Sequence, residues 1–213
     1  MSGARWQTSS ASSEPIRYLA LGDSYTTCTG ASSSAHSWPA IVGKRLSAQT
    51  GREVKVTNPA VNGFTTLDLI DKELGYVKRL KPDLVTILIG VNDLVRGREA
   101  GQYRASLVKI DDEVAALSLS AGRTLAISIP NWSVTPAARQ FGDPEEIRQL
   151  TDTFNDIAQE EAEARGFKWV DITAASIAGL GSAGWISSDD LHPGDKQYAA
   201  WAEVIWHSVR SAW

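Results

Sequence analysis

The sequence has little of what several classes of functional site require. Its 213 residues include one cysteine, Cys28, one methionine and three histidines. A single cysteine excludes an intramolecular disulfide, a zinc site built on cysteines and an iron–sulfur cluster. The cysteine content therefore predicts no such site, and it does not distinguish an oxidising from a reducing compartment.

Long apolar runs and concentrated positive charge are also missing. No run of about eighteen apolar residues occurs, and residues 1–15 lack the apolar segment that a signal peptide requires. The 21 Lys and Arg residues are interleaved with 25 Asp and Glu residues, which argues against nucleic-acid partners and anionic membrane surfaces. We therefore expect a cytoplasmic protein without stable membrane insertion that acts on a small molecule.

The chain length fits one domain, and the composition changes near its start. Residues 1–14 are rich in serine and precede Pro15, which predicts a flexible N-terminal tail. Residues 15–213 are predicted to form a single domain, because this length can bury one substantial core.

Short apolar runs alternate with segments of helical period throughout this domain. Strands are predicted at 16–21, 53–57, 83–89, 124–129 and 168–172. Helices are predicted at 38–50, 67–80, 102–121, 145–165 and 194–211, and a loop that frames a pocket at 130–142. The nearly continuous apolar run DLVTILI is typical of a strand buried on both faces of a parallel sheet. The alternation predicts a three-layer α/β/α sandwich.

Polar motifs follow the first three predicted strands. In a fold of this kind, ligands bind beyond the carboxyl ends of the strands. Gly22-Asp23-Ser24 follows the first strand, the segment 58–63 follows the second, and the segment 90–93 follows the third. We therefore expect Ser24, Gly63 and Asn92 at the same edge of the sheet.

Only one of the three histidines has the setting of a catalytic base. A serine becomes an effective nucleophile beside a base, usually a histidine that a carboxylate holds. His36 precedes the first helix and His207 lies near the end of the last one. His192 lies in SSDDLHPG after the fifth strand, three residues after Asp189 and two after Asp190. The spacing alone does not separate the two acids.

Acyl transfer also requires hydrogen-bond donors aimed at the oxygen that becomes negative. The backbone N–H groups of Ser24 and Gly63 and the side-chain amide of Asn92 are suitable donors. Taken singly, Gly63 and Asn92 are better explained as turn residues, and His192 is equally well explained as a turn or capping residue. Their occurrence together after successive strands favours a site.

Four segments resemble the sequence blocks of the SGNH hydrolases, also called the GDSL esterase/lipase family. They occur in the family's order over nearly the whole chain, at 22–26, 62–63, 90–93 and 189–193. Two residues differ from the commonest pattern, since Tyr25 replaces the more frequent leucine and Asp190 fills a position that glycine often holds.

The resemblance implies a flavodoxin-like fold with a five-stranded parallel sheet of order 2-1-3-4-5, and ester hydrolysis without a metal or cofactor. It implies that Ser24 is the nucleophile and His192 the base. It favours Asp189 as the acid of the triad, since the family's acid stands three positions before its histidine. Ser24, Gly63 and Asn92 would form the oxyanion hole.

Other functions remain compatible with the sequence. The segment 26–30 is similar to the hydroxyl-rich phosphate loop of flavodoxins, which would make the protein an FMN-binding module. The serine site would also serve an acyltransferase, in which another alcohol replaces water. The blocks do not encode the acyl group or the alcohol, so small acyl, lipid and carbohydrate esters are all candidates. Candidate pocket walls are Trp38, Trp132 and Trp185.

Overall fold

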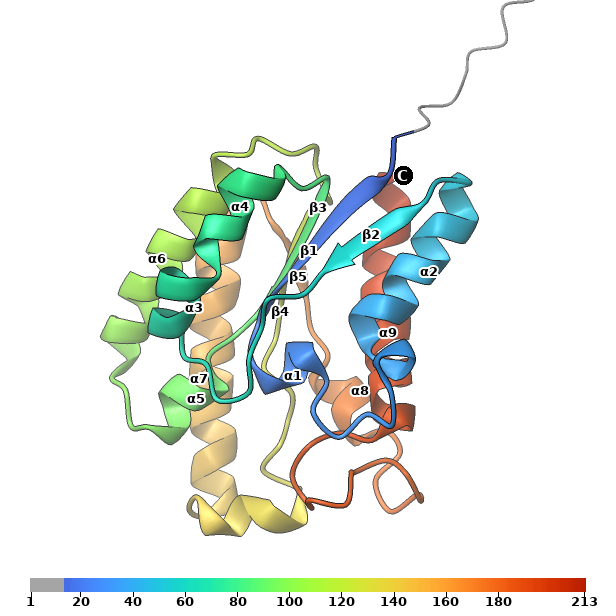
Figure 1. The fold of residues 1–213 in the computed structure, drawn as a ribbon. Helices are drawn as coiled ribbons and strands as arrows, with labels where there is room; N and C mark the ends of the chain where they lie inside the picture. Colours follow the sequence, from blue (N-terminus) through green and yellow to red (C-terminus); the bar gives the residue numbers. More distant parts are fainter. Residues whose placement is uncertain (1–13) are drawn as a thin grey trace, which may run out of the picture.

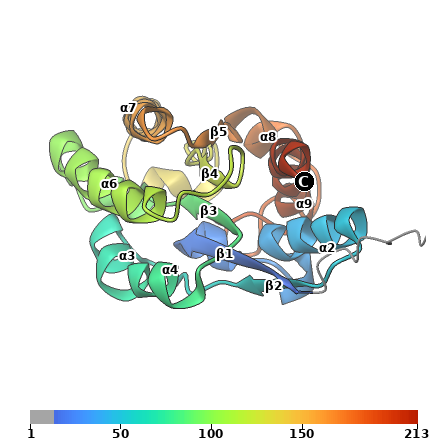
Figure 2. The ribbon, with the colours of Figure 1, turned by 90° about the horizontal axis from the view of Figure 1, so that it is seen from above.

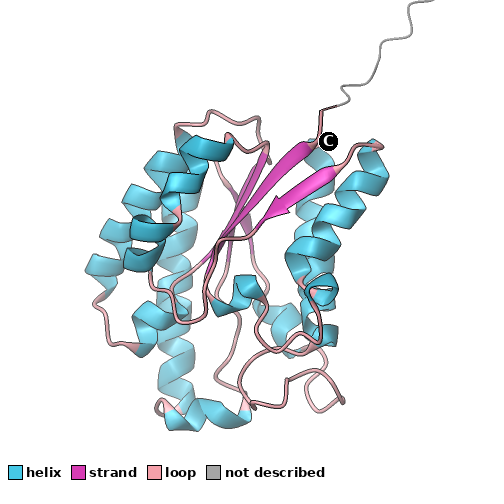
Figure 3. Ribbon diagram, in the orientation of Figure 1, coloured by secondary structure: helices cyan, strands magenta, loops and turns pink. Residues whose placement is uncertain are grey.

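A computed structural model describes residues 14–213, which form three layers (Figure 1, Figure 3). The middle layer is a sheet of five parallel strands in the order β2-β1-β3-β4-β5. The strands are β1 (Ile16–Gly22), β2 (Val54–Thr57), β3 (Leu84–Leu88), β4 (Thr124–Ile127) and β5 (Lys168–Val170). This confirms the predicted fold class and strand order. The expected tail lies outside the described residues, apart from Glu14.

Helices cover both faces of the sheet, as Figure 2 shows from above. One face carries α3 (Thr66–Lys72), α4 (Leu74–Leu80), α6 (Ala100–Ala115) and α7 (Pro144–Ala164), and the other carries α2 (Trp38–Thr50), α8 (Thr173–Ile177) and α9 (Asp195–Val209). Two short helices, α1 (Ser24–Thr27) and α5 (Val91–Val95), lie at the carboxyl ends of β1 and β3 (Figure 1). Within residues 14–213, no helix combines the length and apolar character needed to cross a membrane.

Nearly all buried apolar side chains of the described residues form one core cluster around the sheet, and Ala60, Ala137 and Trp185 lie outside it. All five residues of β3 are buried, as the run DLVTILI predicts. Helix α2 has the predicted bounds because both of its ends are capped. The Ser37 hydroxyl accepts from the Ala40 N–H at the start, and Gly51 ends the helix with φ of 67°, a conformation that glycine adopts readily.

Two predicted helices have the wrong extent. The segment 67–80 is not one helix but two, α3 and α4, which meet at Glu73, a residue whose side chain points into the core. Helix α6 ends at Ala115 and not at residue 121, because the chain turns at Ser118 with φ of 51°. Helices α1, α5 and α8 have at most five residues each, too few to show a helical period in the sequence.

Candidate active site

The turn after β1 presents Ser24 at the start of α1. The Asp23 carboxylate caps this helix, because its Oδ1 accepts from the Tyr25 N–H at 3.0 Å. Gly22 has φ of 155°, and a Cβ at this position would overlap both Thr26 Oγ1 and the Leu88 carbonyl oxygen. A glycine is therefore required where strand and helix meet so closely.

Two side chains from elsewhere in the chain fix this turn. The indole N–H of Trp38 donates to the Tyr25 carbonyl oxygen at 2.8 Å, and the side-chain amide of Asn58 donates to the Thr26 carbonyl oxygen at 2.7 Å. Trp38 is fully buried. The candidate role of Trp38 as a pocket wall does not hold, since its side chain supports the serine turn from within the core.

His192 and Asp189 form a hydrogen-bonded pair in the loop before α9. His192 Nδ1 lies 2.6 Å from Asp189 Oδ2, while Asp189 Oδ1 accepts from the backbone N–H groups of His192 and Leu191 and from the Ser187 hydroxyl. Burial opposes ionisation of Asp189, but these hydrogen bonds outweigh it and hold its pKa well below the ordinary value. No such contact is made by Asp190, which is exposed and has φ of 61°. The structure therefore pairs Asp189 with the imidazole.

The imidazole lies beside the serine turn. The rings of Tyr25 and His192 are in edge contact, with centroids 6.0 Å apart and an interplanar angle of 65°. Because Nδ1 faces Asp189, Nε2 is the nitrogen left for another partner. Among residues 14–213, no hydrogen bond joins the Ser24 hydroxyl to His192, and such bonds in hydrolases are often completed only when substrate is bound.

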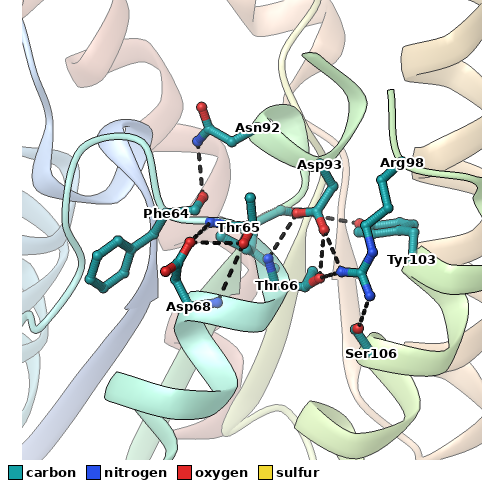
Figure 4. Close-up of polar contacts among 10 residues, drawn as sticks. Phe64, Thr65, Thr66, Asp68, Asn92, Asp93, Arg98, Tyr103 and Ser106 are labelled. Carbon is teal, nitrogen blue, oxygen red and sulfur yellow. Dashed lines mark hydrogen bonds and ion pairs between the residues drawn. The ribbon is translucent and has the colours of Figure 1, made fainter. Parts of the chain in front are cut away.

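The loops that follow β2 and β3 bring Phe64, the residue after Gly63, next to Asn92 (Figure 4). The Asn92 amide donates one of its two N–H groups to the Phe64 carbonyl oxygen at 2.9 Å, which leaves the second for another acceptor. Arg96 holds the preceding carbonyl of the loop, since its guanidinium donates to the Gly63 oxygen at 2.8 Å. Gly63 itself has φ of 84°.

A buried ion pair joins these two loops below the surface. The carboxylate of Asp93, which is fully buried, accepts from the N–H and hydroxyl of Thr66 at 2.8 and 2.6 Å. Arg98 donates to the same carboxylate at 2.8 Å and to the Ser106 hydroxyl at 2.9 Å, as Figure 4 shows. This network fixes the start of α3 against α5 and α6, and so sets the spacing between Gly63 and Asn92.

The sequence pattern of the GDSL-like lipase/acylhydrolase family matches residues 20–200, a span that contains all four blocks. The chain belongs to this family. It is therefore a carboxylic ester hydrolase.

Similar proteins of the family include curated esterases and solved structures. Esterase TesA of Pseudomonas aeruginosa is 24% identical over 196 residues, which cover 90% of this chain and 87% of that protein. The acetylxylan esterase of Geobacillus stearothermophilus is 26% identical over 122 residues, 57% of this chain and 56% of that protein. A crystal structure of TesA superposes with a TM-score of 0.73 at 21% identity and covers 92% of this chain and 99% of its own. A lipase/acylhydrolase from Enterococcus faecalis gives 0.73 at 23% identity, with 92% and 96% coverage.

The segment 26–30 does not have the form of a phosphate cradle in this family member. The Thr27 hydroxyl donates to the Ser24 carbonyl oxygen, and the Thr26 hydroxyl is buried against the Leu21 carbonyl oxygen. Cys28 is also buried, and burial raises the pKa of its thiol far above the ordinary value. The hydroxyls of Thr26 and Thr27 thus bond to their own turn, and the thiol does not have the lowered pKa of a reactive cysteine.

A narrow cavity lies beside the serine turn of this hydrolase. Residues of the loop 130–142, which is predicted to frame a pocket, line it. Its free volume is about 10 Å³, and it is lined mainly by Tyr25, Pro130, Trp132, Val134, Leu180, Leu191, Pro193 and Trp201. Trp132, a candidate pocket wall, lines this cavity. Trp185 does not, because it packs over Gly179 and donates to the Ser176 carbonyl oxygen. A larger hollow of about 440 Å³ lies at the opposite ends of the strands from Ser24 and is lined by Glu14, Pro15, Arg17, Arg52, Lys55 and Asp83.

Sequence reasoning missed three residues of this region. Arg96 and Arg98 hold the two rim loops, and the side chain of Glu73 reaches the end of β1. Nothing in their local sequence marks them, because each acts on a segment that only the fold brings near.

Proposed function

We propose that the chain is a serine esterase that cleaves carboxylic esters through an acyl-enzyme on Ser24. One observation carries the proposal: the Asp189–His192 pair, joined at 2.6 Å, lies in ring contact with the residue that follows Ser24. A nucleophile, a base and an orienting acid in this relation are the elements of a catalytic triad. Gly63 and Asn92, fixed at the same edge, supply the donors that acyl transfer requires.

The proposed reaction begins when His192 Nε2 takes the proton of the Ser24 hydroxyl. The serine oxygen attacks the ester carbonyl, and the N–H groups of Ser24 and Gly63 and the Asn92 amide bind the resulting oxyanion. His192 then gives its proton to the leaving alcohol. Water, activated by the same imidazole, attacks the acyl-enzyme, releases the acid and restores Ser24.

Asp189 is proposed to keep the imidazole in the reactive tautomer. Its hydrogen bond to Nδ1 leaves Nε2 free of a proton and able to accept one from Ser24. Since its pKa is held well below the ordinary value, Asp189 stays ionised over the whole working pH range and stabilises the charged imidazole as it forms.

We infer that short acyl groups are the preferred substrates. The cavity beside Tyr25 has a free volume of only about 10 Å³, about that of one water, and its lining includes neither Ser24 nor His192, so it offers no slot for a long acyl chain. The names of two relatives, an esterase and an acetylxylan esterase, are compatible with small acyl esters. Transfer to another alcohol instead of water uses the same residues, and competition between water and added alcohols separates the two. A cytoplasmic location stays a prediction from the sequence.

A series of chromogenic esters of increasing acyl length tests the proposal. We expect acetyl and propionyl esters to be hydrolysed with the highest kcat/KM, and Ser24→Ala to lose at least about 1,000-fold in kcat. Ser33→Ala, which removes an exposed hydroxyl from the same rim, serves as the matched control and should keep wild-type activity. Full activity in Ser24→Ala would show that another residue is the nucleophile.

A further inference from the structure

Glu73 is an unexpected residue at the junction of two helices. It interrupts the segment predicted as one helix, and its side chain is fully buried although it carries a carboxyl group. Its Oε2 accepts from the Gly22 N–H at 3.0 Å. The helix break thus delivers a carboxyl group to the end of β1, two residues before Ser24.

This carboxyl group belongs to a buried acidic cluster beneath the serine turn. Asp23, Glu73 and Asp93 are all fully buried. Asp93 is paired with Arg98, but Asp23 Oδ2 and Glu73 Oε1 contact no hydrogen-bonding group of the described residues. Two unpaired carboxylates close together in a core cannot both carry a charge at low cost, so at least one of them holds its proton at neutral pH.

The other charged groups around Glu73 do not neutralise it. Asp68 on α3 adds a further negative charge nearby and is itself paired with Lys72, and Arg98 is engaged by Asp93. Tyr103 from α6 is neutral, since burial raises the pKa of its phenol far above the ordinary value. No cation within the described part of the chain is bonded to Glu73.

We propose that Glu73 is a positioning residue of the esterase. In its protonated form, Glu73 accepts from the Gly22 N–H, which holds the end of β1, and it places no negative charge near the oxyanion. The inference rests on the proposed role of Ser24. Burial raises the pKa of Glu73 to about 8, although the Gly22 N–H lowers it, and the carboxyls of Asp23 and Asp68 raise it further. The protonated form therefore predominates at neutral pH.

The distance makes the charge state matter for catalysis. Two residues of chain span at most about 7 Å, so the Glu73 carboxyl lies within about 10 Å of the Ser24 N–H. A negative charge at this distance opposes the oxyanion and lowers the rate by roughly 10-fold at an effective dielectric constant of about 20. Ionisation of Glu73 should therefore slow the wild-type enzyme at alkaline pH.

The test compares kcat as a function of pH, from about 6 to 9.5, in wild type and three variants. Glu73→Gln keeps the size and the acceptor for the Gly22 N–H but has no charge at any pH. Glu73→Leu removes the acceptor, and Asp71→Asn removes an exposed acid from the same helix as a control. Circular dichroism of each variant shows whether it is folded over the pH range.

We expect wild type and Asp71→Asn to lose roughly 10-fold in kcat through a transition near pH 8 that Glu73→Gln lacks, whereas ionisation of Asp23, whose pKa burial raises to about 7, is common to all four proteins. Glu73→Gln should also retain most of the neutral-pH kcat that Glu73→Leu loses. An unchanged alkaline transition in Glu73→Gln, or a loss at pH 7 as large as that of Glu73→Leu, would overturn the inference. Labelling of wild type, but not of Ser24→Ala, by a fluorophosphonate shows separately whether the proposed function itself holds.

Discussion

Replacing Asp189 by asparagine is the perturbation that tests the proposed triad at its most specific point. The asparagine side-chain oxygen can keep the three hydrogen bonds that Oδ1 accepts from Ser187, Leu191 and His192, so the loop should stay folded. Its NH₂ group would face His192 Nδ1 where a carboxylate oxygen now lies at 2.6 Å. Since NH₂ only donates, it would favour the tautomer with the proton on Nε2, which cannot accept a proton from Ser24.

A change of this kind lowers kcat by about 10⁴-fold, or about 5 kcal/mol, where a serine–histidine–aspartate triad operates. We expect a loss of that order for Asp189→Asn in steady-state hydrolysis of p-nitrophenyl acetate, with a much smaller change in KM. Asp190→Asn is the matched control, because its exposed carboxyl contacts neither the imidazole nor Ser24, and it should stay within about 2-fold of wild type. If Asp189→Asn kept a tenth of the activity, or if Asp190→Asn lost as much, the assignment of the acid would be refuted.

Three further predictions concern the rim loops and stability. Asn92→Ala should lower kcat by roughly 100-fold or more, because it removes one oxyanion donor. Arg96→Met should lower kcat by about 5-fold in the same assay, since the exposed guanidinium no longer holds the Gly63 carbonyl oxygen; an unchanged kcat would limit Arg96 to a surface role. Burial raises the pKa of Asp23 to about 7 and that of Glu73 to about 8, so the folded chain keeps protons that the unfolded chain loses above about pH 4. The free energy of unfolding, from urea titrations, should therefore fall between about pH 4 and 8, and Glu73→Gln should make the slope shallower by up to about 1.4 kcal/mol per pH unit.

The sequence was sufficient for the fold because its local signals agree with one another. The five strands, the capped ends of α2 and the continuous apolar run of β3 are encoded in short stretches that need no knowledge of distant contacts. The strand order followed from the resemblance of the four blocks. Ser24, Gly63 and Asn92 each follow a predicted strand in the sequence. Their positions after successive parallel strands are the reason why the sequence groups them as one candidate site.

What the sequence did not reveal depends on contacts between distant segments. The helical period of 67–80 is unbroken in the sequence, and only the partner of Glu73 at Gly22 explains why α3 and α4 separate. The role of Trp38 also depends on a distant contact. Its position beside a rim loop is visible in the sequence and suggests a pocket wall, but its hydrogen bond to the Tyr25 carbonyl oxygen is not visible there.

The choice between Asp189 and Asp190 required coordinates as well. Both acids precede His192 in one turn, but Asp189 faces the imidazole while Asp190 is exposed and has a left-handed conformation. Only the resemblance favoured Asp189 beforehand, and spacing alone could not separate the two.

Peptide mapping of the protein after reaction with a fluorophosphonate tests the central claim most directly. We expect one stoichiometric phosphonyl adduct on Ser24, formed at a rate that falls together with kcat in Asp189→Asn and absent from Ser24→Ala. An adduct on a different residue, with ester hydrolysis retained in Ser24→Ala, would contradict it.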